Sequence, residues 1–360
     1  MSEPEVTTLR HNPLNAVTET VERLTYADGR TAIRKRLRRP VGASEGPWAA
    51  STDPRHWNYW RREIEVYRDE ELRAQLKAAG LVLPEAEVVE DGGGAVPKPE
   101  GVAGSGSPEA EVVDGGGAVL MLEDVAGLPG TEFGFAEHGA LARACGRWQA
   151  RASGEREWTS RGFLRTYSTT RVVPWELVDD DDAWRQPLIA ETWPPGLRRA
   201  WRELLANRER LLKLVESSPR TRCHLDIWVS NVIQRPDGEF ALLDWAFTGD
   251  GALGEDIGNH IPDAVFDLFW PAERQAELAD VCVTNYLAGL GEAGWRGDSD
   301  VVRRAVLASG VKYAWLLPHL LGRAGLAGHQ AYHQDADSRH LYQQRGRALE
   351  TVAKWCAEAM

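Results

Sequence analysis

The chain has little of what several classes of protein require. It contains only four cysteines in 360 residues, with no Cys-x-x-Cys pair, so neither a zinc site nor a disulfide framework is indicated. No apolar run reaches the roughly eighteen residues of a membrane span, so none is expected. Acidic residues outnumber basic ones by 54 to 42, and this balance argues against nucleic acid as a partner, because phosphate contacts need a basic face. The polar N-terminal segment lacks the apolar core of a secretion signal, so we expect a cytoplasmic protein.

The first part of the chain has the pattern of a small antiparallel sheet. Residues 17–37 contain two apolar-rich runs on either side of Asp28-Gly29, which is a strong signal for a β-hairpin. Residues 50–80 then carry apolar side chains at helical spacing, which predicts one helix with Asp53 as its N-cap.

The rest of the sequence is mostly of helical period, apart from a strand-rich patch at residues 223–247. We therefore predict an α+β fold in two lobes. The first lobe, residues 1–122, should hold a small antiparallel sheet and one helix. The second lobe, residues 128–360, should be larger and helical, and residues 123–127 should form the hinge between the two lobes.

A short segment of the first lobe occurs twice. PEAEVVEDGGGAV begins at residue 84, and PEAEVVDGGGAV begins at residue 108. Two copies are too few for a solenoid, so we interpret the repeat as a hairpin whose first strand is duplicated. One copy should pair in the sheet and the other should be extra loop. Between them, residues 97–107 are rich in Gly, Ser and Pro, which is typical of a flexible insertion.

The patch CHLDIWVSNVIQRPDGEFALLDWAF, residues 223–247, carries the polar residues of most chemical interest. Its two apolar runs flank a Pro-Asp-Gly turn, so Asp226 and Asn231, which enter the hairpin, should lie near Asp244, which leaves it. In phosphoryl transfer, one carboxylate orients the attacking hydroxyl, while an amide oxygen and a second carboxylate hold Mg²⁺ against the nucleotide phosphates. Each residue alone is more typical of a turn. Their order and spacing together favour the catalytic interpretation.

These motifs resemble those of a known enzyme family. The segments His224-Leu225-Asp226, Asn231 and Asp244-Trp245 are similar to the catalytic motifs of the aminoglycoside phosphotransferase family, small-molecule kinases with a protein-kinase-like fold. GALGEDIGN at 251–259 resembles the family's segment after the metal-binding Asp, and MLEDVAG at 121–127 resembles its hinge.

The resemblance implies a role for each matched residue. Catalysis would fall to Asp226 and His224, with Mg²⁺ bound by Asn231 and Asp244. The hinge residues implied as nucleotide contacts are Glu123 and Val125.

The nucleotide phosphates also need a cation from the first lobe. TAIRKRL at 31–37 offers Lys35, which the family's Lys-Arg-Leu ending favours, whereas the Ala-Ile-Lys spacing of protein kinases would favour Arg34. On the following helix, Glu63 is the expected partner of this cation, and Glu65 is the second choice.

The segment that should cover the phosphates departs from the kinase pattern. Residues 11–24 contain no glycine, although a glycine-rich loop lets backbone N–H groups approach phosphates. Small or hydroxyl-bearing residues of this segment, here Asn15, Thr18 and Thr20, are the candidates for that contact.

We therefore predict an ATP- or GTP-dependent kinase that uses Mg²⁺ and acts on a hydroxyl of a small molecule, such as an aminoglycoside or another natural product. One alternative is a Ser/Thr kinase that acts on a biosynthetic precursor peptide. Another is a nucleotide-binding pseudokinase, which the glycine-free loop suggests. The acidic run at residues 179–182 could attract a cationic acceptor, although such runs are usually solvated loops.

Overall fold

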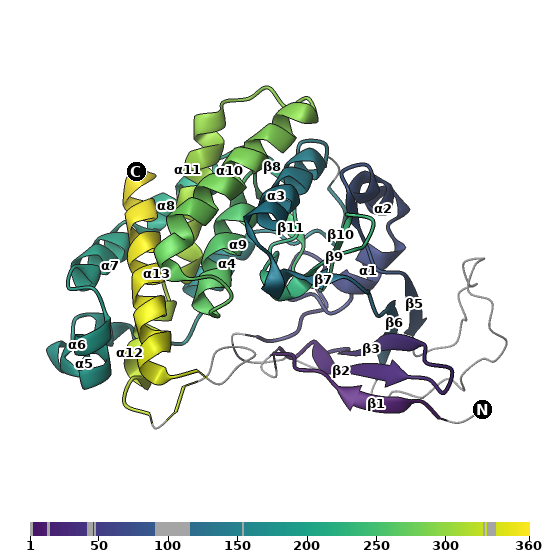
Figure 1. The fold of residues 1–360 in the computed structure, drawn as a ribbon, viewed down its shortest axis with the longest axis horizontal. Helices are drawn as coiled ribbons and strands as arrows, with labels where there is room; N and C mark the ends of the chain where they lie inside the picture. Colours follow the sequence, from purple (N-terminus) through teal and green to yellow (C-terminus); the bar gives the residue numbers. More distant parts are fainter. Residues whose placement is uncertain are drawn as a thin grey trace.

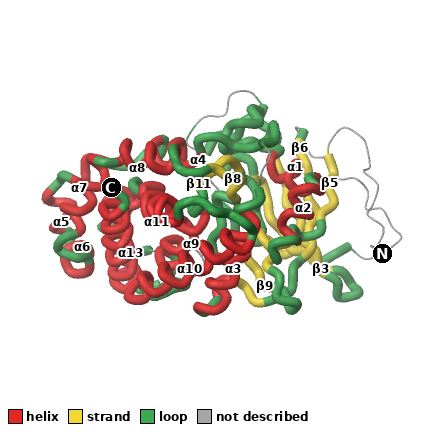
Figure 2. The backbone as a smooth tube through the Cα atoms, turned by 90° about the horizontal axis from the view of Figure 1, so that it is seen from above, coloured by secondary structure: helices red, strands yellow, loops and turns green. Residues whose placement is uncertain are grey.

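The computed structural model describes residues 3–12, 15–41, 46, 48–90, 116–152, 155–326, 328–329 and 336–360. The expected insertion at 97–107 lies outside these residues. Helices and strands occur in separate regions, as the α+β prediction requires (Figures 1 and 2). Within the described part of the chain, no helix is both long and apolar enough to cross a bilayer.

The N-terminal region forms a five-stranded antiparallel sheet in the order β1-β2-β3-β6-β5. Its strands are β1 (Glu5–Thr8), β2 (Thr18–Thr25), β3 (Thr31–Arg38), β5 (Ala86–Glu90) and β6 (Gly117–Glu123). The predicted hairpin is confirmed, because β2 and β3 pair across a turn in which Gly29 has a φ of +83°. Such a positive φ is favourable for glycine, which has no Cβ.

The two copies of the repeat have different places in the five-stranded sheet. The first copy forms β5, which pairs with β6 from Ala86 opposite Leu122 to Glu90 opposite Ala118. The last residues of the second copy, 117–119, form the start of β6. The prediction that one copy pairs in the sheet is confirmed by β5, while residues 108–115 of the other copy lie outside the described part.

The expected single helix at 50–80 is wrong in its extent, because the structure has two short helices, α1 (Arg62–Arg68) and α2 (Glu70–Lys77). The buried guanidinium of Arg62 donates hydrogen bonds to the carbonyls of Pro54, His56 and Trp57 at 2.9, 2.6 and 2.7 Å. These carbonyls are therefore satisfied without a helix, and the segment before α1 remains a series of turns. The N-cap of α2 is Asp69, which accepts a hydrogen bond from the Leu72 N–H at 2.9 Å.

The rest of the chain is largely helical and lies beside the sheet (Figure 1). Its helices are α3 (Phe135–Gln149), α4 (Phe163–Thr169), α5 (Asp181–Arg185), α6 (Pro187–Thr192), α7 (Leu197–Ala206), α8 (Arg208–Glu216), α9 (Glu255–Phe266), α10 (Gln275–Glu292), α11 (Ser299–Ala308), α12 (Leu316–Arg323) and α13 (Ser338–Glu358). The backbones of α3 and α10 approach closely, since a Cβ at Gly146 would lie 2.2 Å from the carbonyl oxygen of Tyr286.

Two small sheets connect the sheet region to the helices. The first has the order β4-β10-β9-β7 and contains β4 (Leu81–Val82), β7 (Leu128–Pro129), β9 (Val232–Gln234) and β10 (Phe240–Leu242). The second pairs β8 (Arg220–Cys223) with β11 (Gly249–Ala252). Because β4 follows α2 and pairs with β10, the chain around the predicted hairpin is fixed against the N-terminal region.

Candidate active site

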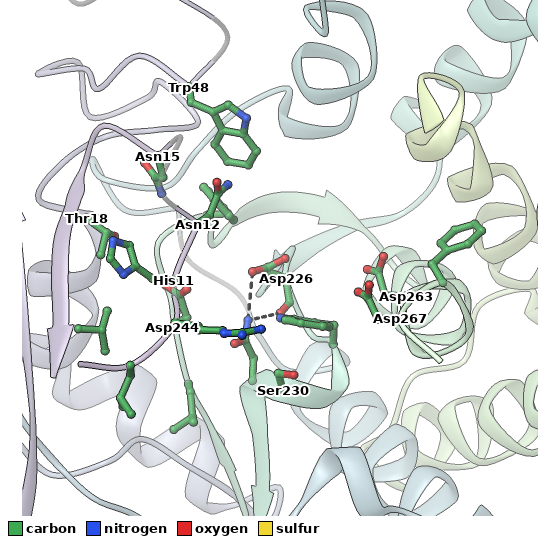
Figure 3. A pocket seen from close by; sticks show the side chains of 18 of the residues that line it. His11, Asn12, Asn15, Thr18, Trp48, Asp226, Ser230, Asp244, Asp263 and Asp267 are labelled. Atoms are coloured by element: carbon green, nitrogen blue, oxygen red, sulfur yellow. Dashed lines mark hydrogen bonds between the residues drawn. The ribbon is translucent and has the colours of Figure 1, made fainter. Parts of the chain in front are cut away.

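A cleft of about 1320 Å³ is lined by residues of both the five-stranded sheet and the helical region. It exceeds the roughly 300–1,000 Å³ of an ordinary small-molecule pocket, so it has room for two ligands. Asp226 and Asp244 line it (Figure 3), and Asn231 and Lys35 from β3 line it as well. The structure therefore brings these four predicted residues into one cavity.

The predicted hairpin is formed by β9 and β10, and it positions the two candidate metal ligands. Val232 pairs with Leu242, and the Leu243 N–H donates a hydrogen bond to the Asn231 carbonyl at 2.9 Å. Asn231 and Asp244 therefore lie at the same end of the hairpin. The Asn231 Nδ2 donates to the Asp226 Oδ2 and to the Asp226 carbonyl, both at 3.0 Å. The Oδ1 atom of the amide is thus the oxygen that could face a cation.

The backbone of the loop is held in an uncommon conformation. Leu225 has a φ of +68° and Asp244 a φ of +56°, a region that is unfavourable for most residues other than glycine. The buried carboxylate of Asp256 on α9 accepts hydrogen bonds from the His224 N–H at 2.9 Å and from the Leu225 N–H at 2.7 Å. Asp256 thus stabilises the strained turn just before Asp226. The motif GEDIGN is the sequence signal that could have identified Asp256.

His224 has a structural role in this loop. It is fully buried, its Nε2 donates to the Leu243 carbonyl at 3.0 Å, and its Nδ1 accepts from the Asp226 N–H at 3.3 Å. Burial lowers the pKa of His224 to about 4, so the ring is neutral near pH 7. Both ring nitrogens are hydrogen-bonded to the backbone, so His224 holds the chain at Asp226 and at Leu243 in place, and its catalytic role stays a prediction.

Lys35 lies at the centre of an ion-pair network inside the cleft. Its Nζ is 2.6 Å from the Glu63 Oε2 and 2.8 Å from the Asp244 Oδ1. Burial disfavours the Lys35 charge, but the two carboxylates outweigh it, so the pKa of Lys35 is raised above its ordinary value. The same ammonium outweighs the effect of burial on Asp244 and lowers the pKa of that carboxyl.

The two alternative residues are engaged elsewhere. The Arg34 Nε lies 2.8 Å from the Glu22 Oε2 on the opposite face of the sheet, since successive side chains of a strand alternate. The Glu65 Oε1 lies 3.2 Å from the Arg61 Nε, one helical turn away. The ion pair expected between a β3 cation and the helix is therefore formed by Lys35 and Glu63.

Asp226 has an unusual electrostatic environment. The pKa of Asp226 is raised to about 7, because burial and the nearby carboxylates of Asp244 and Asp263 together outweigh the opposing effect of the Lys312 ammonium. Lys312 is itself buried, and its Nζ lies 3.5 Å from the Asp263 Oδ2. In Figure 3, Asp226 lies between Asp244 on one side and Asp263 and Asp267 on the other. The carboxylate thus stands at the junction of two halves of the cleft.

The donor set fits a magnesium ion. Mg²⁺ prefers oxygen ligands and is usually held by one or two carboxylates with phosphates and waters, and Asn231 and Asp244 offer an amide oxygen and a carboxylate. Within the described ranges, no three His, Cys, Asp or Glu residues form a group that could hold a metal alone. Asp244 is still open to the cleft, with 42% of its side chain exposed.

The remaining nucleotide candidates differ in their environment. Thr18, Glu123 and Val125 line the cleft. Asn15 also lines it, but its Oδ1 accepts hydrogen bonds from the Val17 N–H and from the Asn58 Nδ2, both at 3.1 Å, so this oxygen shapes the loop. Thr20 is not among the residues that line the cleft.

Comparisons with known proteins agree with this geometry. Residues 65–297, about two thirds of the chain, match the sequence model of a family described as "Phosphotransferase enzyme family". The matched segment includes Asp226, Asn231 and Asp244, and it begins after Lys35 and Glu63. No curated protein sequence matches the chain.

Solved structures of similar fold cover almost the whole chain. An amicoumacin kinase in complex with AMP-PNP, Ca²⁺ and Ami has a TM-score of 0.52 and 15% identity over 97% of this chain and 88% of its own. An aminoglycoside phosphotransferase from Alicyclobacillus acidocaldarius has a TM-score of 0.50 and 18% identity, with 98% of this chain and 91% of its own chain covered. A thermostable mutant of aminoglycoside phosphotransferase APH(4)-Ia has a TM-score of 0.51 and 13% identity, with 99% of this chain and 95% of its own chain covered. These similarities confirm the predicted two-lobed α+β fold.

Proposed function

This chain belongs to the phosphotransferase enzyme family and is a kinase with a hydroxyl acceptor, and on that premise we propose that it transfers the γ-phosphoryl group of ATP or GTP to a hydroxyl of a small molecule. The observation that carries the proposal is the convergence of Lys35, Asp226, Asn231 and Asp244 on one cleft. Each has the chemistry that phosphoryl transfer requires at that place.

The nucleotide occupies the half of the cleft next to the five-stranded sheet. Lys35 binds its phosphates, and Glu63 orients the lysine through their 2.6 Å ion pair. Glu123 at the end of β6 and Val125 just after it contact the base, and Thr18 and Asn15 lie over the phosphates. In this assignment residues 1–122 form the nucleotide-covering lobe, residues 123–127 the hinge and residues 128–360 the acceptor-binding lobe.

Asn231 and Asp244 would hold Mg²⁺ through their oxygens, and a bound ion would supply positive charge against the nucleotide phosphates. Lys35 exchanges part of its contact with Asp244 for the phosphates when the nucleotide enters. An amide oxygen, a carboxylate and an adjacent ammonium are all present, which favours an active kinase over a pseudokinase.

Asp226 acts on the acceptor. Its carboxylate accepts a hydrogen bond from the acceptor hydroxyl and aligns the oxygen with the γ-phosphate. It takes the proton as the phosphate–oxygen bond forms and the bond to the nucleoside diphosphate breaks. The Asn231 amide fixes the carboxylate at 3.0 Å, so the base is oriented before the acceptor binds.

The acceptor is a small molecule, and we place the reaction in the cytoplasm. The four cysteines are all buried and unpaired, which agrees with a reducing compartment. A screen of hydroxyl compounds by release of nucleoside diphosphate tests the function. Acceptor-dependent release that disappears in Asp226→Asn supports it. Equal release by the wild-type enzyme and by folded Asp226→Asn would contradict it.

A further inference from the structure

The end of the cleft farthest from the sheet is rich in basic side chains. Trp315, His319 and Arg323 are spaced by four residues, so they share one face of α12, and all three line the cleft. Arg171, from the chain after α4, and Arg345, from α13, also line the cleft. Figure 1 shows α12 and α13 on the side of the molecule opposite β1, β2 and β3. α12 and α13 are therefore remote from the five-stranded sheet, while Arg171 also packs against Trp48 of the N-terminal region.

Arg171 is held in place by three aromatic rings. Its guanidinium carbon lies 4.3 Å from the ring centre of Trp48, 3.8 Å from that of Tyr167 and 5.0 Å from that of Trp315. Such contacts orient a guanidinium without neutralising its charge. In the part of the chain that the structure describes, its buried Nη2 has no hydrogen-bond acceptor. Arg171 is thus a rigid cation at the wall of the cleft.

The acidic residues nearby are matched by other cations. Asp263 lies 3.5 Å from Lys312, and Asp267 lies 3.6 Å from Arg345. The structure shows no ion pair between Arg171 or Arg323 and any described carboxylate. Among the described residues, the guanidinium groups of Arg171 and Arg323 therefore have no carboxylate partner at this end.

The basic groups are close enough to influence one another. Burial lowers the pKa of His319, and the positive charges of Arg323, Arg345 and Arg171 lower it further. The acidic run at residues 179–182 cannot offset this charge, because it does not line the cleft and its Asp179 and Asp181 form ion pairs with Arg202 and Arg198.

We propose that the acceptor carries an anionic group, a carboxylate or a phosphate, which binds between Arg171 and Arg323 while the acceptor hydroxyl reaches Asp226. The inference rests on the proposed function, since it names the acceptor class of the same cleft. Guanidinium groups suit both anions because they donate paired hydrogen bonds in a fixed geometry. A cationic aminoglycoside would instead place like charges together at this end, which is unfavourable.

Binding to the full chain, saturated with AMP-PNP and Mg²⁺, tests this directly. The probes are glycerate for a carboxylate, glycerol 3-phosphate for a phosphate, glycerol as the neutral control and kanamycin as the cation, each titrated by calorimetry. We expect at least one anionic probe to bind about 10-fold or more tightly than glycerol, as one charge-assisted hydrogen bond would provide. The stronger of the two anions identifies which group the site takes.

Variants locate the site. Arg323→Ala, on the exposed side of α12, and Arg171→Met should each remove most of the preference for the anion. Arg185→Ala, an exposed arginine on α5 outside the cleft, is the matched control and should not change it. If Arg171→Met fails to fold, the anion preference of Arg323→Ala still tests the proposal.

The proposal is overturned if the anionic probes bind no better than glycerol, if kanamycin binds most tightly, or if Arg185→Ala has the same effect as Arg323→Ala. Asp226→Asn separates this failure from failure of the proposed function. It should lower kcat by roughly 10²–10⁴-fold and keep the preference for the anionic probe over glycerol, because both probes make the same hydroxyl contact with residue 226.

Discussion

Lys35 and Asp244 are 209 residues apart in the sequence, yet the Lys35 Nζ lies 2.8 Å from the Asp244 Oδ1. The contact joins β3 of the five-stranded sheet to the chain that leaves β10. Since the same ammonium is also paired with Glu63, the two sides of the cleft meet at one buried cation. Nucleotide phosphates would enter at this point.

Lys35→Met should raise the KM for the nucleotide and lower the free energy of unfolding. Glu63 would be left buried without its cation, and breaking a buried ion pair typically costs about 3–5 kcal/mol. Steady-state kinetics and urea unfolding measure the two effects. Arg34→Met is the matched control, because Arg34 pairs with Glu22 on the other face of the sheet, and its nucleotide KM should be unchanged. A similar rise in KM in both variants would contradict the assignment of Lys35.

Asp244→Ala should abolish turnover and weaken the binding of the Mg²⁺–nucleotide complex. The change removes one of only two proposed protein ligands of the ion. Calorimetric titration with AMP-PNP in the presence and absence of Mg²⁺ checks this, and the difference between the two titrations should shrink. Normal Mg²⁺-dependent binding by the folded variant would show that Asp244 does not bind the metal.

Asp226→Asn should lower kcat by roughly 10²–10⁴-fold, which corresponds to about 3–5 kcal/mol of barrier. The amide keeps the size of the carboxylate but accepts no proton. Nucleotide affinity should change little, because Asp226 is not assigned to the metal. If Asp226 were only a turn cap, the variant would lose about 0.5–2 kcal/mol of stability with near-normal kcat, so melting temperature and kcat measured together distinguish the two roles.

Asp256→Asn should lower both stability and kcat without a large change in the nucleotide KM. Its two oxygens accept the His224 and Leu225 N–H groups, and an amide can serve only one of them. The unpaired buried N–H should cost about 1–3 kcal/mol of stability. Asp250→Asn, at a partly exposed position on β11, is the control for a charge change nearby. A variant as stable and active as the control would refute this role of Asp256.

Stability should fall on acidification partly through the buried pair His138 and His260. The His138 Nδ1 lies 2.9 Å from the His260 Nε2, and the His260 Nδ1 donates to the Ile227 carbonyl at 3.2 Å. Burial lowers the pKa of His138 to about 3 and that of His260 to about 4, from an ordinary value of 6.5. Their contribution is therefore fully present above about pH 6.5 and is lost as the pH falls toward these values, because the unfolded chain binds protons first.

His138→Asn isolates this contribution, since it keeps a donor toward His260 and does not titrate. Its free energy of unfolding should fall less than that of the wild type between pH 7.5 and 5.0, by up to about 1.4 kcal/mol per pH unit for each proton no longer taken up. Urea unfolding at the two pH values provides the comparison. His340→Asn, at an exposed position on α13, is the control. Identical pH dependence in wild type and His138→Asn would exclude the effect.

Local patterns in the sequence determined the α+β fold class, the β2–β3 hairpin and the grouping of Asp226, Asn231 and Asp244. These features depend on contacts between nearby residues, and a hairpin brings its two ends together whatever surrounds it. The family resemblance favoured Lys35 over Arg34 for the same strand. Spacing alone did not decide between Lys35 and Arg34. Adjacent residues of a strand face opposite sides of the sheet, and which side is buried depends on the whole sheet.

Only the tertiary structure decided the extent of the helix after residue 50 and the composition of the acceptor end of the cleft. Helix α1 begins at Arg62 because the guanidinium of this residue donates hydrogen bonds to the carbonyls of the preceding turns. Helical periodicity in the sequence does not reveal such a contact. Arg171, Arg323 and Arg345 come from three separate segments. Each alone is typical of a surface charge. They line one cleft because Tyr167 of α4 contacts Trp315 at the start of α12, and because the Tyr342 hydroxyl of α13 donates a hydrogen bond to the Leu320 carbonyl of α12. Charge at a site depends on distance in space, and distance between remote segments is fixed by packing of the core.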